Sequence, residues 1–202
     1  MKTLILIALF AIFNACEGPP KPKNAEIDRS NVDHSAMDHS KMESSPGMAN
    51  QPYDLQFIDT MIKHHQGAVD MALLVKTRSR QPELIELAKS IIDDQTKEIA
   101  LMKKWRDSRF AGKPAAVNMD LAGMHDGMTG MDIAKLDSLK DRAFDMEFVR
   151  QMIPHHGGAV AMAKEALQKS ENTEIKELAT SIVRSQDAEI KKMRDWQSVW
   201  EK

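Results

Sequence analysis

Residues 57–72 read FIDTMIKHHQGAVDMA, and residues 148–163 read FVRQMIPHHGGAVAMA. The two stretches share most of their apolar residues and both carry a His-His pair at the same place. The correspondence continues without a gap as far as Trp105 and Trp196. A repeat of this length indicates a duplicated structural unit.

Each copy has the hydrophobic spacing of two helices, because apolar residues recur alternately four and three positions apart. In the first copy one such row contains Phe57, Met61, His64, Ala68, Met71 and Val75. The next row contains Leu84, Ala88, Ile91, Gln95, Glu98, Met102 and Trp105, and it follows Pro82, which suits a first helical turn. Short connections predict antiparallel hairpins, and two hairpins that bury their apolar faces against each other form an all-α four-helix bundle.

The N-terminus is typical of an export signal. Lys2 precedes a short apolar run at residues 4–13, and the single cysteine, Cys16, follows a small residue. The run is too short for a permanent membrane span, and its end resembles a bacterial lipobox, where the Cys is acylated after cleavage. An ordinary signal peptide cut nearby is the alternative. We expect an exported, membrane-anchored lipoprotein that faces the periplasm or the cell surface.

Composition divides the rest of the chain. The residues after Cys16 are rich in Pro, Ser, Asn and Lys, which predicts a disordered tether. A Gly- and Met-rich stretch without helical or strand period lies between the two copies, and such a long loop is usually functional or disordered. The predicted organisation is a signal peptide (1–15), a lipidated tether (16–51), a first hairpin (52–110), a Met-rich linker (111–137) and a second hairpin (138–202).

The overall charge argues against nucleic acid as a partner. The formal net charge is −2, with 29% charged residues, so no strongly basic surface is expected. Fifteen methionines stand out. Flexible thioethers often fill helical cores, so a metal-binding interpretation requires that they lie beside histidines.

Each repeat places a Met one helical turn before a His pair, where the side chains can chelate one ion. The motif residues are Met61, His64 and His65 in the first copy and Met152, His155 and His156 in the second, followed by Met71 and Met162. Adjacent helical residues differ by about 100° around the axis. We therefore expect one His of each pair to bind an ion, while the other flanks it or serves a second ion.

The donor types favour a soft metal. Thioether sulfur selects Cu(I), or its analogue Ag(I), and imidazole also suits copper. The Glu-x-x-His motif of di-iron bundles is absent from both motif helices, since Met takes the place of the acid. Packing alone remains the alternative, particularly for Met71, Met102, Met162 and Met193.

Two further clusters have the same His and Met pairing and could collect ions with modest affinity, because binding must order the chain. In the tether these are His34, Met37, His39 and Met42. In the linker they are Met119, Met124, His125, Met128 and Met131.

Polar residues interrupt the apolar row of each second helix, at Gln95, Glu98, Gln186 and Glu189. A buried carboxylate must be paired or hydrogen-bonded, so each Glu could accept the free ring N–H of a motif His and fix its tautomer. The alternative is that this row reaches solvent near these residues. Pro154 lacks a backbone N–H and is expected to kink or open its helix.

The two His-His-x-Gly-Ala-Val-x-Met-Ala segments resemble the DUF305 family, most specifically from Phe148 to Ala163. The first copy departs from the family pattern at Lys63, where Pro is usual. The family is ferritin-like, rich in His and Met, and includes periplasmic copper-binding proteins of the CopM type. The resemblance implies copper or silver binding in metal tolerance, with Met61, His64, His65, Met71, Met152, His155, His156 and Met162 as ligands.

These patterns predict a binding protein and not an enzyme. The first hypothesis is an extracytoplasmic copper buffer or chaperone, loaded with Cu(I), that acts in copper tolerance and exchanges metal with copper efflux or chaperone proteins. A ferritin-like metal oxidase and a metal-free envelope interaction module are the alternatives.

Overall fold

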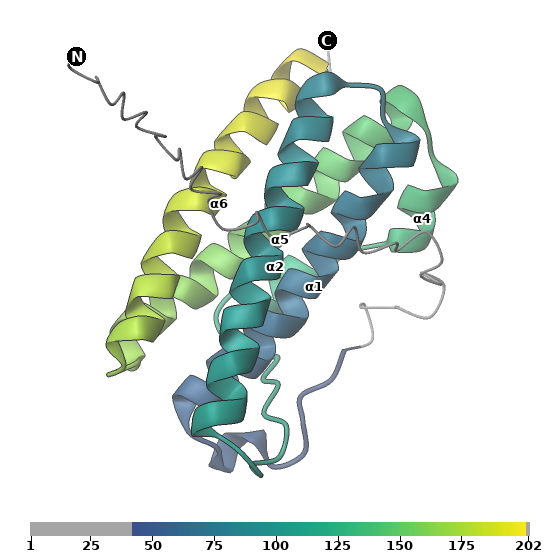
Figure 1. The fold of residues 1–202 in the computed structure, drawn as a ribbon. Helices are drawn as coiled ribbons and strands as arrows, with labels where there is room; N and C mark the ends of the chain where they lie inside the picture. The colour runs from purple at the N-terminus through teal and green to yellow at the C-terminus, as the bar shows by residue number, and fades with distance from the viewer. Residues whose placement is uncertain (1–41, 201–202) are drawn as a thin grey trace, which may run out of the picture. The chain divides into compact units, whose positions relative to one another are not determined.

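The computed structural model describes residues 42–200, and in this range it contains helices and loops but no strands (Figure 1). The long helices are α1 (Tyr53–Arg78), α2 (Pro82–Arg109), α5 (Asp141–Lys169) and α6 (Thr173–Trp200). The short ones are η3 (Met48–Asn50), α3 (Met124–Met128) and α4 (Ile133–Ser138). The predicted all-α bundle of two helical hairpins is confirmed.

The two hairpin turns are built alike, as expected for a duplicated unit. Ser79 Oγ accepts a hydrogen bond of 3.1 Å from the backbone N–H of Gln81 just before α2. Ser170 Oγ accepts the equivalent bond, also 3.1 Å, from Asn172 just before α6. Such short-range bonds satisfy the backbone where a helix ends, so each turn reverses the chain within a few residues.

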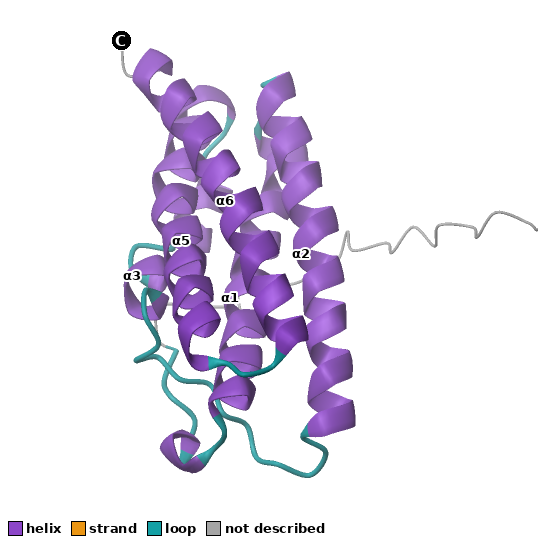
Figure 2. Cartoon of the chain, turned by 90° about the vertical axis from the view of Figure 1, so that its left-hand side faces the viewer, coloured by secondary structure: helices purple, strands orange, loops and turns teal. Residues whose placement is uncertain are grey.

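The helices α1 and α5 lie against each other, with α2 packed on α1 and α6 packed on α5. Figure 2 shows the long helices side by side. An ion pair between Arg109 and Glu174 joins the end of α2 to the start of α6, so these two helices run in opposite directions. Since each hairpin is itself antiparallel, α1 and α5 are also antiparallel. Their equivalent segments can therefore meet at one place.

The linker between the hairpins packs onto the bundle. The backbone N–H of Asn118 donates to Thr60 Oγ1 on α1 at 2.8 Å, and that of Asp132 donates to Gln151 Oε1 on α5 at 2.8 Å. Its buried apolar residues include Leu121, Met124, Met128, Met131 and Leu136. The linker has no helical period in sequence, yet it contains α3 and α4 and contributes to the core.

Helix α5 continues through Pro154 without interruption, so the expected opening of this helix is wrong. Pro154 is exposed. Within residues 42–200, no helix is both long enough and apolar enough to cross a bilayer.

Candidate metal centre

The four histidines of the repeated motifs are buried on the facing helices α1 and α5, where one ring of each pair meets its counterpart. His64 and His65 on α1 and His155 and His156 on α5 all have 0% exposed surface. The rings of His64 and His155 lie with their centroids 3.8 Å apart and an interplanar angle of 39°. Within each helix the two ring centroids are 6.4 Å apart. Each His pair thus sends one ring to the helix interface and the other to a different neighbour.

That other neighbour is a carboxylate on the second helix of the same hairpin. His65 Nε2 lies 2.7 Å from Glu98 Oε2, and His156 Nε2 lies 2.8 Å from Glu189 Oε2. A carboxylate that accepts the Nε2–H of each ring would leave the lone pair on Nδ1. Neither His65 Nδ1 nor His156 Nδ1 has a hydrogen-bond partner, although both are buried. Histidines that bind metals have the same arrangement, in which one ring nitrogen donates to a carboxylate and the other faces the metal.

The amides of Gln95 and Gln186 lie on the same helices, three residues before these carboxylates. Both glutamines are buried, and the Oε1 atom of each lacks a hydrogen-bond partner. Buried polar atoms without partners are uncommon. The two hairpins therefore place equivalent sets of imidazole nitrogen and amide oxygen in the interior.

Two glycines allow close packing beside the central rings. A Cβ atom placed on Gly127 would lie 2.9 Å from His64 Nε2. A Cβ atom on Gly67 would lie 3.1 Å from Met131 Sδ and 3.2 Å from His155 Nε2. A thioether and an imidazole nitrogen thus both lie against Gly67, where a larger residue would displace them.

Burial lowers the pKa of His64 well below its ordinary value, and the neighbouring His65 and His156 lower it further. The backbone of His155 opposes this shift in part. His64 is therefore a neutral imidazole at neutral pH. This is the form that a metal ion requires.

Methionine sulfurs surround the centre as part of the core. Those on the long helices, all with 0% exposed surface, are Met61, Met71, Met102, Met152, Met162 and Met193. Those of the linker, Met124, Met128 and Met131, are also buried. The linker sulfurs were predicted to belong to a flexible segment, whereas the structure buries them in the core, with Met131 beside His155.

The remaining candidates lie away from the centre or outside the described residues. Met119 is half-buried, His125 is exposed, and Met42 packs against the edge of the core. Cys16, His34, Met37 and His39 lie outside the described range.

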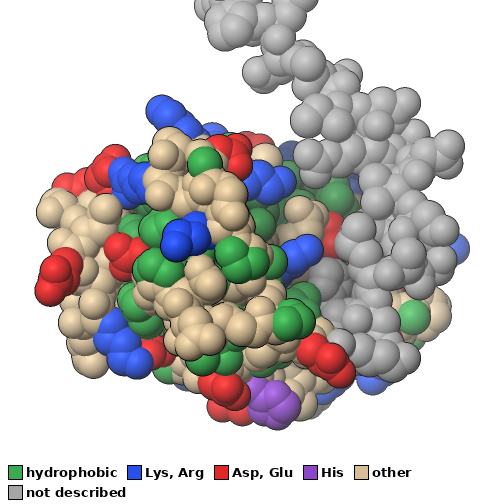
Figure 3. Space-filling view, turned by 90° about the horizontal axis from the view of Figure 1, so that it is seen from below, with side chains coloured by type: hydrophobic (Ala, Val, Ile, Leu, Met, Phe, Trp, Pro, Cys, Tyr) green, Lys and Arg blue, Asp and Glu red, His purple; other side chains and the backbone are tan. Residues whose placement is uncertain are grey.

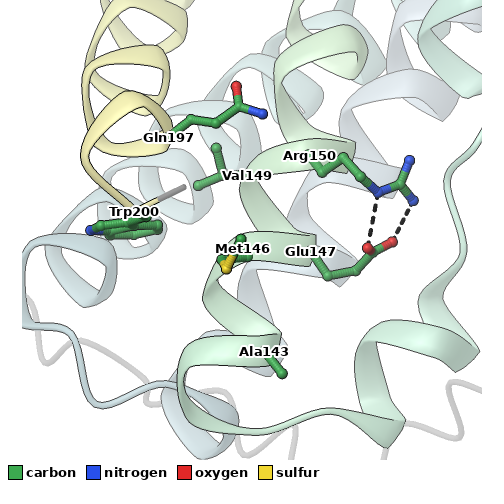
Figure 4. Close-up of a pocket in the computed structure, with 7 residues that line it drawn as sticks. All are labelled: Ala143, Met146, Glu147, Val149, Arg150, Gln197 and Trp200. Atoms are coloured by element: carbon green, nitrogen blue, oxygen red, sulfur yellow. Dashed lines mark hydrogen bonds and ion pairs between the residues drawn. The ribbon is translucent and has the colours of Figure 1, made fainter. Parts of the chain in front are cut away.

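No three side chains of the His, Cys, Asp or Glu type converge at metal-binding distance within residues 42–200. The surface pocket between α5 and α6 contains no His and is lined by Ala143, Met146, Glu147, Val149, Arg150, Gln197 and Trp200 (Figure 4). The buried centre is therefore the site whose donors suit a soft metal.

The sequence matches the family described as domain of unknown function 305 over residues 12–106 and over residues 54–197. The chain belongs to the DUF305 family. This confirms the resemblance seen in the repeated His-His segments. DUF305 membership covers both hairpins and hence the whole buried centre.

Solved structures give the same fold. CopM in its Cu(I)-bound form is 40% identical, with a TM-score of 0.63 over 74% of this chain and 99% of CopM. A DUF305 protein from Streptomyces coelicolor, assigned as secreted, is 30% identical, with a TM-score of 0.65 over 73% of this chain and 92% of its own. An uncharacterised protein of Acanthamoeba polyphaga mimivirus is 38% identical over 58 residues, and this match spans 38% of its length.

Proposed function

We propose that this DUF305 protein binds copper as Cu(I), with silver as an analogue, at the buried centre formed by α1 and α5. The observation that carries this proposal is the contact between the fully buried rings of His64 and His155, which come from the two copies of one motif. CopM, which is similar over almost its whole length, has been solved with Cu(I), Cu(II) and silver bound. The ion is the cargo of the protein.

The donor set supports a monovalent soft ion. The described residues offer no triad of His, Cys, Asp or Glu. Since Met131 Sδ and His155 Nε2 both lie against Gly67, we propose that the ion takes thioether sulfur as well as imidazole nitrogen. Sulfur of this type selects Cu(I) over hard divalent ions. We assign His64, His155 and Met131 as primary ligands, because the rings of His64 and His155 lie against each other and both Met131 Sδ and His155 Nε2 lie against Gly67.

The flanking residues complete the centre. Glu98 and Glu189 orient His65 and His156, whose Nδ1 atoms are available to an ion. Removing such an orienting partner typically weakens metal binding by about 10- to 100-fold. Met61, Met71, Met152 and Met162 supply further sulfur in the surrounding core.

A site that encloses its ion suits a metal buffer or chaperone in copper tolerance. We propose that the protein acts outside the cytoplasm, anchored through Cys16, and exchanges copper with efflux or chaperone proteins. The lipobox-like N-terminus and the similarity to a Streptomyces protein assigned as secreted support this location.

Competition with a chromogenic Cu(I) chelator tests the proposal. We expect the double variant His64→Gln, His155→Gln to lose most of its affinity for Cu(I), whereas His125→Gln, at an exposed histidine, keeps it. Met131→Leu removes the sulfur but conserves the side-chain volume, so this variant should fold normally. It should nevertheless bind Cu(I) more weakly than the wild type. Equal affinities for all of these variants and the wild type would exclude the buried centre.

A further inference from the structure

The buried centre must open before an ion can be exchanged, because the four motif histidines are fully enclosed. This inference rests on the proposed function. The segment that covers the central rings is α3, which packs on α5 and also contacts α1. Gly127 of α3 lies directly over His64 Nε2 and against Gly158 of α5, whose Cα would be 3.0 Å from a Cβ at residue 127.

Both ends of α3 have the backbone conformation of a hinge. Gly123, immediately before the helix, has a φ of 77°, and Gly130, two residues after it, has a φ of 84°. Glycine populates both signs of φ readily, whereas other residues avoid positive values. The chain can therefore change direction on both sides of this helix with little strain.

The attachment of α3 to the bundle is short. A helix of five residues is not stable by itself and must be held by packing. It buries the side chains of Met124 and Met128, and its closest backbone contact with α5 is made between glycines. The neighbouring polar attachments are the bonds from Ala122 N–H to Glu165 Oε2 and from Asp132 N–H to Gln151 Oε1, both 2.8 Å.

Opening the centre elsewhere would be more costly. The other walls are the long helices α1, α2, α5 and α6, whose buried faces form the core. Separating them would expose large apolar side chains to water, which is strongly unfavourable. Opening α3 exposes only the two large side chains of Met124 and Met128, so it costs less than separating the long helices and occurs more often.

We propose that residues 124–128 form a gate that swings on Gly123 and Gly130 and admits Cu(I) or Ag(I) to the His64–His155 pair. The gate carries the thioethers of Met124 and Met128 on its buried side. His125, on its outer side, is the single exposed histidine among residues 42–200. Figure 3 shows a His side chain on the surface with acidic side chains beside it.

The test uses two glycines with matched strain. Gly130 and Gly112 have φ values of 84° and 73°, and a Cβ atom on either would meet nothing within 4 Å. Alanine therefore strains the backbone at both positions, but only the strain at residue 130 is relieved when the gate opens. We expect Gly130→Ala to release Ag(I) to a chelating dye about tenfold faster than the wild type. The equilibrium affinity of Gly130→Ala for Ag(I) should stay within about twofold of the wild-type value, because the rates of binding and release rise by the same factor. Gly112→Ala should release Ag(I) at the wild-type rate.

A second readout needs no metal. Hydrogen peroxide converts accessible Met to its sulfoxide, and mass spectrometry of metal-free protein reports oxidation of Met124 and Met128 separately. Both should oxidise about tenfold faster in Gly130→Ala than in Gly112→Ala. If either release or oxidation in Gly130→Ala matches Gly112→Ala, the gate is wrong although copper binding stands. If the wild type fails to bind Cu(I), the proposed function itself fails, whatever the oxidation rates show.

Discussion

Replacing Glu189 with Ala removes the acceptor that holds His156 in place. His156 is fully enclosed, and its Nε2 lies 2.8 Å from the Glu189 carboxylate. Without that oxygen the buried N–H has no partner, which typically costs about 1–3 kcal/mol of folding free energy. The ring also loses its fixed tautomer, so Cu(I) affinity should fall by about 10- to 100-fold. Urea unfolding and Cu(I) competition measure the two effects.

The repeat supplies a graded comparison. The Glu98 side chain is 15% exposed against 11% for Glu189, so water can replace part of the lost hydrogen bond at His65. We expect Glu98→Ala to lose less stability than Glu189→Ala. Glu189→Gln keeps an oxygen acceptor and should remain within about 1 kcal/mol of the wild type. Unchanged urea midpoint and Cu(I) affinity in Glu189→Ala would refute the assigned role of this carboxylate.

Two further predictions concern packing and pH. A Cβ on Gly158 would lie 2.5 Å from the Gly123 carbonyl oxygen, so Gly158→Ala should lower the unfolding free energy by about 1–3 kcal/mol in a urea titration. A Cβ on Gly157 would meet nothing within 4 Å. Gly157→Ala should therefore not destabilise the protein in the same titration. Hydrogen bonds from Arg150 hold the pKa of Glu147 at about 2, against an ordinary value of 4.5. Their contribution is present above pH 4.5 and lost as the pH falls towards 2. Between pH 4.5 and pH 2, urea titrations should show that the unfolding free energy falls by about 1–2 kcal/mol less in Glu147→Gln than in the wild type. An equal fall in both proteins would contradict this role of Glu147.

The helices could be predicted from sequence because their signals are local. Apolar spacing predicted the faces of α1 and α5, and Pro82 indicated the start of α2. The duplication then implied that the hairpins pack alike. The contacts from His65 to Glu98 and from His156 to Glu189 join residues on helices of one hairpin, 33 positions apart in both copies.

The linker and the pairing of His64 with His155 were beyond the reach of these patterns. Met and Gly in the linker show no period, so sequence gave no sign that α3 packs over the rings. Its position depends on contact between Gly127 and Gly158, which lie on separate elements. Likewise, the ring contact between α1 and α5 depends on how two hairpins dock, a long-range property that spacing within one helix does not encode.

The central proposal is that imidazole and thioether bind the same ion inside the bundle. X-ray absorption at the copper edge of Cu(I)-loaded protein tests it most directly. We expect a mixed shell of nitrogen and sulfur neighbours, with the outer-shell scattering of imidazole. A shell of sulfur alone, or of nitrogen and oxygen without sulfur, would contradict it.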